Sequence, residues 1–445
     1  MHVVERLAEF AQIHRGRPIG PQVLHHAKRA VIDWHAALFP GARVAPAALL
    51  ERALAQELDH GDAHLALGRR ATIRAAALIN AAAAHTLEVD DIFREGIYHP
   101  GAPTIAAALA VAQGARASGE QFLRAVIAGY EISTRIAAAM GRAHYKYWHN
   151  TGTIGCFGAA SAAAELLGLD RKRFAHALAT VATFSAGLQQ AFRADSMSKP
   201  MHAGRAAEAG VTAALAAAEG VTGSLDIMEG EAGYGRAMGD GPDWERSLAT
   251  LGEDFHITQM TFKNHACCGH AFAAIDGALA LKERMGLAAA EIARVRVGGY
   301  RATLEVAGIA DPATAAEARF STPYLVATAL THGSVRLAAF EPARLEDGAT
   351  RSLMRRVEVA LDLELDAAFP AQRSARVAIE SHDGRRGEHL QATRKGDPDM
   401  PLSDAELEHK YFELVSPVLG EERARRLLAR LWRLEREAAV PAAHG

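Results

Sequence analysis

Three stretches of the sequence place a histidine or a lysine directly before an alanine- and glycine-rich segment of helical length. His99 opens HPGAPTIAAALAVAQ, His149 opens HNTGTIGCFGAASAAAELLGL, and Lys199 and His202 lie in SKPMHAGRAAEAGVTAALAA. Proline in the first turn and small polar residues before an apolar run are typical of helix starts. The start of a helix attracts carboxylates and phosphates, because it exposes unpaired N–H groups and a partial positive charge. These stretches therefore predict helix ends that together bind a small polyanion.

The pattern favours a polycarboxylate over a nucleotide as that anion. No G-x-x-x-x-G-K-[ST] loop occurs in the chain, and the glycine-rich EGEAGYG and GRAMGDG lack the strand-to-helix setting of a dinucleotide fingerprint. We interpret both glycine-rich segments as surface turns.

The titratable residues at these helix starts suggest proton transfer as well as binding. Lys199 precedes Pro200 at the edge of an apolar helix, where partial desolvation would allow its amine to act as a base. His99, His149 and His202 have polar neighbours and are candidates to bind the anion or to move protons.

The other histidines and the cysteines are interpreted as structural. His85, His144 and His332 are expected to make ordinary hydrogen bonds within the fold. Cys267 and Cys268 are expected to be buried small residues, because no Cys–His–Asn pattern of a nucleophile is evident.

We expect no metal site. The segment HACCGH, residues 265–270, holds closely spaced potential ligands, but no second Cys/His pair follows at zinc-finger spacing, and H-E-x-x-H is absent. Glu88, Asp90 and Asp91 lie near His99 and offer oxygen ligands for a hard cation. Acidic residues in such loops usually cap helices and face solvent.

Charge and hydropathy exclude several classes of partner. The 49 basic and 52 acidic residues give a net charge of -3, which is no electrostatic footprint for nucleic acid. The basic C-terminal segment RARRLLARLWRLEREA is interpreted as the solvated face of a helix. The N-terminus lacks a signal-peptide core, the apolar tracts are shorter than the ~20 residues of a membrane span, and three cysteines form no disulfide framework. These features predict a cytoplasmic protein that does not bind membranes.

The composition and periodicity predict a mainly α protein of two domains. The chain of 445 residues is 49% hydrophobic but only 6% aromatic and contains 39 Gly, which favours helices packed closely through small side chains. Helical segments fill residues 1–262, and alternating, valine-rich strand patterns follow. We expect an all-helical domain over 1–262, completed by about 403–445, and a smaller α+β domain over 263–402.

Five blocks of the sequence resemble the MmgE/PrpD family, in the family's order and over most of the chain. They are HTLEVDDIFREGIYHPG, WHNTGTIGCFGAASAAAELLGL, SMSKPMHAGRAAEAG with LDIMEGEAGY, KNHACCGHAFAAID and ARFSTPYLVATAL. This family includes 2-methylcitrate dehydratase, cis-aconitate decarboxylase and iminodisuccinate epimerase. The resemblance implies that the α+β domain is a lid, that the active site lies between the domains, and that the protein is a homodimer.

The resemblance also assigns site residues. His99, His149 and Lys199, already selected by the helix-start pattern, match the family's site, and His202 matches the histidine of its K-P-x-H block. Tyr324, in the F-S-x-x-Y block, matches a tyrosine that closes over the substrate.

Two departures from the family pattern affect the predicted reaction. Where many members have D-F-D-D-T, this chain has Glu88 at the first position and Ile92 at the last. Where many members have C-C-x-x-x-H, this chain has Phe272, and the nearest histidine is His270. The predicted substrate-binding residues are His202, Glu88, Asp91, Thr151, His270 and Tyr324.

The reactions of the family share proton removal from carbon next to a carboxylate, or its equivalent in elimination and decarboxylation. The anionic intermediate needs oriented positive groups, which helix ends, histidine and lysine supply without a cofactor. The hypothesis is that Lys199 is the base, that His149 and His99 bind or protonate, and that Tyr145 acts on the opposite face. The departures favour epimerisation of an iminodisuccinate-like substrate. Dehydration of a 2-methylcitrate-like acid, cis-aconitate-type decarboxylation and non-catalytic polycarboxylate binding are the alternatives.

Overall fold

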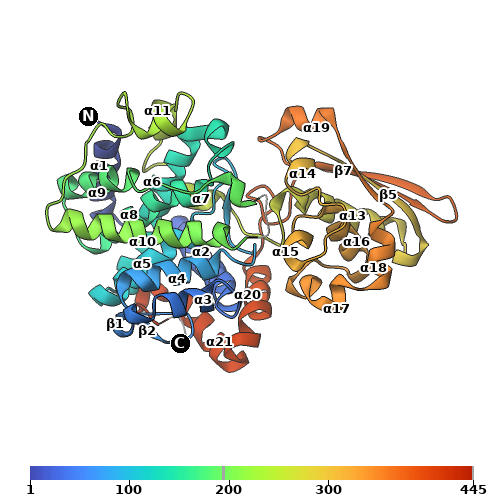
Figure 1. Cartoon of the computed structure of the whole chain (residues 1–445), viewed down its shortest axis with the longest axis horizontal. Coiled ribbons are helices and arrows are strands. Elements are labelled where there is room, and N and C mark those ends of the chain that lie inside the picture. Colours follow the sequence, from blue (N-terminus) through green and yellow to red (C-terminus); the bar gives the residue numbers. More distant parts are fainter. Residues whose placement is uncertain (193–195, 443–445) are drawn as a thin grey trace. The chain divides into compact units, whose positions relative to one another are not determined.

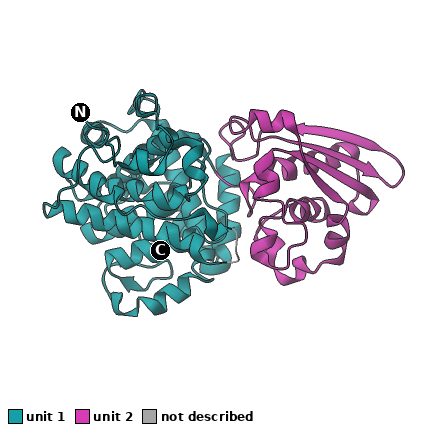
Figure 2. Ribbon diagram, turned by 45° about the horizontal axis from the view of Figure 1, so that its top comes forward, with its two compact units in different colours: residues 1–261, 403–445 teal, residues 262–402 magenta. Residues whose placement is uncertain are grey.

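The computed structural model describes residues 1–192 and 196–442 of the chain. The chain divides into two compact units, shown in teal and magenta in Figure 2. Unit 1 comprises Met1–Thr261 and Ser403–Gly445, and unit 2 comprises Phe262–Leu402. The predicted fold class is confirmed, because the chain is mainly helical with a smaller α+β portion. Every helix of the described residues is too short or too polar to cross a membrane.

Unit 1 is built around long helices rich in small residues, labelled in Figure 1. Most of them begin near proline, glycine or a polar cap, as the punctuation of the sequence predicts. The helices are α1 (Val3–Arg15), α2 (Pro21–Gly41), α3 (Ala47–Ala53), α4 (Ile73–Ala84), α5 (Gly101–Ala115), α6 (Gly119–Tyr145), α7 (Asn150–Thr153), α8 (Gly155–Leu166), α9 (Arg171–Ala182), α10 (Ser198–Ala218), α11 (Tyr234–Met238), α12 (Trp244–Leu248), α20 (Asp404–Leu419) and α21 (Glu421–Leu431).

Glycine allows the central helices of unit 1 to approach closely. A Cβ atom on Gly210 of α10 would lie 2.5 Å from the backbone nitrogen of Ala160 on α8, far inside contact distance. Similarly, a Cβ on Gly204 of α10 would lie 2.7 Å from the carbonyl oxygen of Leu78 on α4. Helix α10 therefore packs directly against α8 and α4, which places its N-terminus among the ends of the neighbouring helices.

Unit 1 also contains two short antiparallel strand pairs that the sequence analysis does not predict. Strand β1 (Leu58–His64) pairs with β2 (Arg70–Ala71), and β3 (Ile92–Phe93) pairs with β4 (Met260–Thr261). The second pair connects the segment after α4 to the end of the first part of unit 1. Strands β2, β3 and β4 have two residues each, too few for a period, and the sequence of β1, LDHGDAH, lacks the alternation of a strand.

The last helices of the chain pack against α2. Arg29 on α2 forms an ion pair with Asp404 at the start of α20. Deeper in the interface, the buried Lys410 donates to the Asp33 carboxylate and to the Val89 carbonyl, each at 2.6 Å. Helix α20 thereby supports the loop between α4 and α5.

Unit 2 is a four-stranded sheet with helices on one face. The strand order is β6-β5-β7-β8, with β6 parallel to β5 and the other neighbours antiparallel. Helix α13 packs on β7 and β8, and α16 packs on α13 and α18. The elements are α13 (Phe272–Met285), β5 (Ile292–Gly299), α14 (Arg301–Glu305), α15 (Ala315–Ala318), α16 (Thr322–His332), α17 (Pro342–Leu345), α18 (Gly348–Met354), β6 (Val357–Leu361), α19 (Leu363–Ala368), β7 (Ala375–Ser381) and β8 (Arg386–Gln391).

Candidate active site

Four histidine rings from four different segments meet inside unit 1. His85 ends α4, His99 precedes the start of α5, His149 is the N-cap of α7, and His202 lies in the first turns of α10. The centroid of the His85 ring is 5.0 Å from that of His99 and 5.2 Å from that of His149. The centroids of the His149 and His202 rings are 5.3 Å apart. We call these four residues the histidine cluster. The helix-start pattern predicts three of them, and the fourth, His85, was expected to be structural.

The buried carboxylate of Asp90 lies between two of these rings. Its Oδ2 atom is 2.7 Å from Nδ1 of His85 and 3.4 Å from Nδ1 of His99. Burial raises the pKa of Asp90, but the two histidines outweigh burial and hold this pKa well below its usual range. Asp90 is therefore an ionised acceptor, and the Nδ1–H group of His85 donates a hydrogen bond to it.

His149 and His202 form the second contact of the cluster, through Nδ1 atoms 3.0 Å apart. Burial lowers the pKa of His149 well below its usual value, and the charges of His85 and Lys199 lower it further. Burial likewise lowers the pKa of His202 to about 4. Both rings are thus neutral near pH 7, and one donates to the other. A buried neutral imidazole of this kind is able to accept a proton from a substrate.

Lys199 brings a positive charge to the same place. Its ammonium group forms an ion pair with Glu88 and lies 5.0 Å above the ring of Phe192. The Phe192 ring in turn meets the His149 ring edge-on, at 4.8 Å between centroids. The backbone of Glu88 has a left-handed φ of 58°, so the loop turns sharply where its side chain reaches Lys199.

Thr151 and Asp91 position the backbone around the cluster. The Thr151 hydroxyl accepts a 3.3 Å hydrogen bond from the backbone N–H of His99. Asp91 accepts from the N–H of Gly101 at 3.0 Å and from the hydroxyl of Tyr130 at 2.8 Å. Burial, with the nearby Asp33 charge, raises the pKa of Asp91 to about 8. Both carboxylate oxygens of Asp91 thus engage protein groups, Gly101 at the start of α5 and Tyr130 within α6, and its role in substrate binding stays a prediction.

Three other predicted residues lie outside the contacts that join the cluster. Tyr145 is the half-buried last residue of α6, four residues before His149. His270 belongs to unit 2, where its Nδ1 atom is 2.9 Å from the Tyr300 hydroxyl. Tyr324 also belongs to unit 2, where it is fully buried and its hydroxyl donates to the Ala339 carbonyl. Tyr324 is thus part of the core of unit 2, and its contact with substrate stays a prediction.

One group of potential metal ligands occurs among residues 1–192 and 196–442. One ring nitrogen of His85, one of His99 and a carboxylate oxygen of Asp90 all lie within 4.8 Å of one another. Two histidines and a carboxylate are a plausible ligand set. However, the 2.7 Å contact between His85 and Asp90 is a direct hydrogen bond, so these atoms satisfy one another without an ion.

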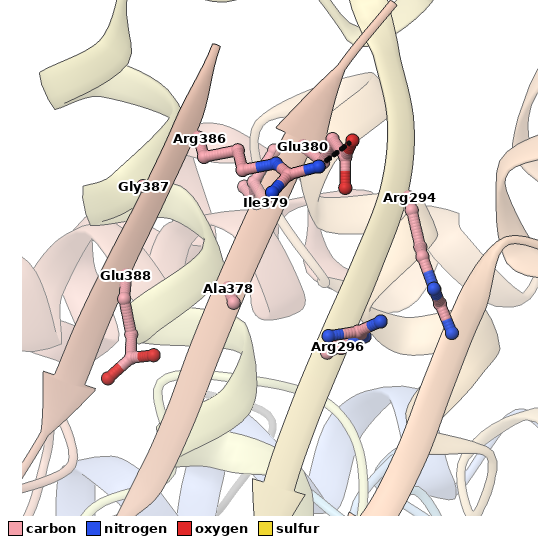
Figure 3. A pocket seen from close by; sticks show the side chains of 8 residues that line it. All are labelled: Arg294, Arg296, Ala378, Ile379, Glu380, Arg386, Gly387 and Glu388. Atoms are coloured by element: carbon pink, nitrogen blue, oxygen red, sulfur yellow. Dashed lines mark hydrogen bonds and ion pairs between the residues drawn. The ribbon is translucent and has the colours of Figure 1, made fainter. Parts of the chain in front are cut away.

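A shallow hollow of about 430 Å³ lies on the outer face of the unit 2 sheet (Figure 3). Arg386 forms a 2.9 Å ion pair with Glu380 across it, and Arg294 pairs with Glu358 on β6. These paired charges are typical of a solvated sheet face. The residues of the histidine cluster do not line this hollow.

Sequence reasoning therefore missed two central residues of the site, His85 and Asp90. They are five positions apart, at the end of one helix and in the loop that follows. The loop folds back so that both side chains meet, and no helical or strand period predicts this return. The nearest available signal was the concentration of acidic residues just before His99.

Known proteins and protein-family models match this chain over most of its length. The MmgE/PrpD N-terminal domain matches residues 5–247, and the MmgE/PrpD C-terminal domain matches residues 265–435. The cis-aconitate decarboxylase-like protein oryM of Aspergillus oryzae is 28% identical over 99% of this chain and 96% of its own length. Cis-aconitate decarboxylases of Homo sapiens and Mus musculus are 25% and 26% identical over 81% of this chain, covering 76% and 75% of their own lengths. The chain belongs to the MmgE/PrpD family.

Proposed function

We propose that this protein is a lyase that releases carbon dioxide or water from a small polycarboxylate, with cis-aconitate as the first candidate substrate. The observation that carries the proposal is the buried histidine cluster beside the Lys199 ammonium, at the starts of α5 and α10. The names of the relatives support the decarboxylase outcome.

Positive charge and helix ends explain how such a substrate binds. The starts of α5 and α10 present backbone N–H groups and partial positive charge, and Lys199 adds a full charge on α10. A tricarboxylate satisfies several of these groups at once. The same groups stabilise the carbanion-like charge that forms next to a carboxylate during either reaction.

The protonation states of the cluster suggest which group moves which proton. His149 is neutral and buried, which suits it to accept a proton from carbon. The Nδ1 atom of His99 lies 3.4 Å from the Asp90 carboxylate, and His99 is assigned the role of proton donor to carbon or to a leaving hydroxyl. Lys199 is paired with Glu88, which favours charge stabilisation over the role of base assigned from sequence.

Epimerisation of an iminodisuccinate-like substrate is the second candidate function. It is favoured by the departures at Glu88 and at Ile92, where the family pattern has a threonine hydroxyl. Ile92 is buried in strand β3. Epimerisation needs a second acid/base group on the opposite face of the substrate, and Tyr145 remains the hypothesis for that group.

Proton NMR in D₂O distinguishes these outcomes. The purified protein is incubated separately with cis-aconitate, 2-methylcitrate and iminodisuccinate. Decarboxylation removes one carboxylate and introduces deuterium, dehydration forms an alkene, and epimerisation exchanges one C–H without other change. We expect decarboxylation or dehydration, and His149→Gln should lower its rate at least 10²-fold. His35→Asn, which changes a buried histidine of α2, is the matched control.

The proposal fails if no substrate reacts or exchanges deuterium. Calorimetric binding of these acids without any exchange would then identify a non-catalytic polycarboxylate-binding protein. Exchange confined to iminodisuccinate would identify the epimerase.

A further inference from the structure

We infer that His85 is a positioning residue of the proposed active site. Its ring is fixed by Asp90, it holds the His149 ring in place, and it shares the Asp90 carboxylate with His99. The sequence assigns His85 no such role. This inference rests on the proposed function, because it describes how the same site is organised.

The geometry leaves the His85 ring little freedom. The residue is fully buried, and its backbone N–H is tied to the Ala81 carbonyl at the end of α4. Its Nδ1 atom donates to Asp90 at 2.7 Å. Rotating the ring by half a turn would remove this hydrogen bond from a buried carboxylate, and leaving a buried polar group without its donor is unfavourable. The ring plane is therefore set by Asp90.

The His85 ring in turn forms a wall for His149. The two rings stack with an interplanar angle of 20° and centroids 5.2 Å apart. On its other edges, His149 meets the Phe192 ring and the Nδ1 atom of His202. A ring enclosed on three sides presents its remaining nitrogen in one direction, which is the requirement for proton transfer to a fixed substrate.

His85 also competes with His99 for the same oxygen. Both present Nδ1 to Oδ2 of Asp90, at 2.7 Å and 3.4 Å. Because one carboxylate oxygen contacts two imidazoles, the shorter contact with His85 weakens the interaction of Asp90 with His99. A weaker interaction with Asp90 makes it easier for His99 to give up a proton to the substrate. Without His85, Asp90 pairs with His99 alone and holds that proton more tightly.

Among residues 1–192 and 196–442, the charged and titratable groups that contact His85 or lie next to those contacts belong to this site. Asp90 and His99 come from the loop before α5, and His149 comes from α7. His202 and Lys199 of α10 lie beyond the His149 ring, and Glu88 is paired with Lys199. After burial, His85 is the first of the neighbours that lower the pKa of His149 and of His202. Changing His85 should therefore change the pH dependence of the site.

Two variants separate the two contacts of His85. His85→Asn retains a donor close to the Nδ1 position and so preserves the bond to Asp90, but it removes the ring that stacks on His149. His85→Phe retains a ring but removes the donor to Asp90. His35→Asn is the matched control, because this buried histidine of α2 has Trp34 and Phe39 as its ring neighbours.

For both His85 variants we expect kcat to fall about 10²-fold while KM changes less than 3-fold, as misplacement of a reacting group predicts. In the pH profile of kcat/KM, the acid limb should move to higher pH in both variants, because the neighbour that lowers the pKa of His149 is removed. His85→Phe should in addition move the alkaline limb to higher pH, because Asp90 then binds His99 alone. His35→Asn should leave both limbs in place even if it lowers the melting temperature.

Nitrogen-15 NMR of histidine-labelled protein gives a readout that does not depend on turnover. Several histidines, such as His35 and His144, carry a proton on Nδ1 because they donate to backbone carbonyls. In the wild type one further Nδ1-protonated ring, that of His85, should persist over the whole range in which Asp90 is ionised, and this one signal should vanish in His85→Phe. The inference is overturned if wild-type limbs and kcat persist in both variants, or if no such signal is lost. If the wild type turns over none of the acids, the proposed function fails, and the labelled spectra still decide the role of His85.

Discussion

At the residue scale, the site is a set of buried groups whose neighbours decide their charge. Asp90 is ionised because two imidazoles face it, whereas Asp91, the next residue, has a pKa raised to about 8 by burial and the nearby Asp33 charge. Adjacent carboxyl groups thus have opposite roles. One belongs to the histidine cluster, and the other holds the N–H of Gly101 and the hydroxyl of Tyr130.

The ion pair of Lys199 with Glu88 makes a prediction for substrate binding. Lys199→Met removes the ammonium and leaves the buried Glu88 carboxylate facing an anionic substrate. We expect KM for cis-aconitate to rise about 10²-fold, because the favourable charge of Lys199 is lost and the negative charge of Glu88 repels the substrate. The double variant Lys199→Met with Glu88→Gln should recover about 10-fold, since the repulsion is removed. Steady-state kinetics of the wild type and these two variants tests this, and equal KM values for the single and double variants would contradict it.

At the element scale, the loop between α4 and α5 carries several residues of the site, and helix α20 holds this loop in place. Lys410 of α20 is buried, and it bonds both Asp33 and the carbonyl of Val89, which lies between Glu88 and Asp90. The last helices therefore affect the site without contributing a side chain to it.

Lys410→Met should destabilise unit 1 and displace this loop. It leaves the Asp33 carboxylate buried without its cation, which costs about 3–5 kcal/mol. We expect denaturant unfolding to show this loss and kcat to fall, with Lys172→Met, at an exposed position of α9, as the control. Adding Asp33→Asn should restore part of the stability, and a double variant no more stable than Lys410→Met would contradict the pairing.

The close approach of α10 to α8 makes a second prediction at this scale. A Cβ on Gly210 would lie 2.5 Å from the Ala160 backbone nitrogen, so Gly210→Ala must push the two helices apart. We expect a loss of about 1–3 kcal/mol in the free energy of unfolding. Gly16→Ala, where the nearest atom is 3.8 Å from the new Cβ, should change this free energy by less than about 0.5 kcal/mol. Equal stabilities for the two variants would show that α10 does not pack as described.

At the scale of the whole molecule, buried neutral histidines should make the protein sensitive to acid. Burial lowers the pKa of His14, His35 and His144 to about 4, against about 6.5 in the unfolded chain. Between these values the unfolded state binds more protons, so stability is full above pH ~6.5 and falls as the pH decreases toward ~4. Each group contributes about 1.4 kcal/mol per pH unit. Asp91 acts in the opposite direction, because its raised pKa removes stability as the pH increases from about 4 to 8.

Denaturant unfolding from pH 4 to pH 8 tests this acid sensitivity. His35→Asn should reduce the slope of stability against pH by about 1.4 kcal/mol per pH unit below pH 6.5, since one protonation is removed. His409→Asn should leave the slope unchanged, because that side chain is exposed. An unchanged slope for His35→Asn would contradict the assignment.

The sequence by itself determined the fold class, the family and most helix starts. Proline, glycine and polar caps act over a few residues, so His99, His149, Lys199 and His202 could be recognised at the starts of helices without tertiary information. Small residues likewise indicated close helix packing, which Gly210 and Gly204 show.

The tertiary structure alone decided which of the candidate residues meet. Asp90 rather than Asp91 joins the histidine cluster, His85 proves central, Lys199 pairs with Glu88, and Tyr324 lies in the core of unit 2. The physical reason is that these choices depend on how an irregular loop turns and on what surrounds each group when water is removed. Local sequence patterns report propensity and periodicity, whereas burial and charge pairing arise from segments that are far apart in the chain.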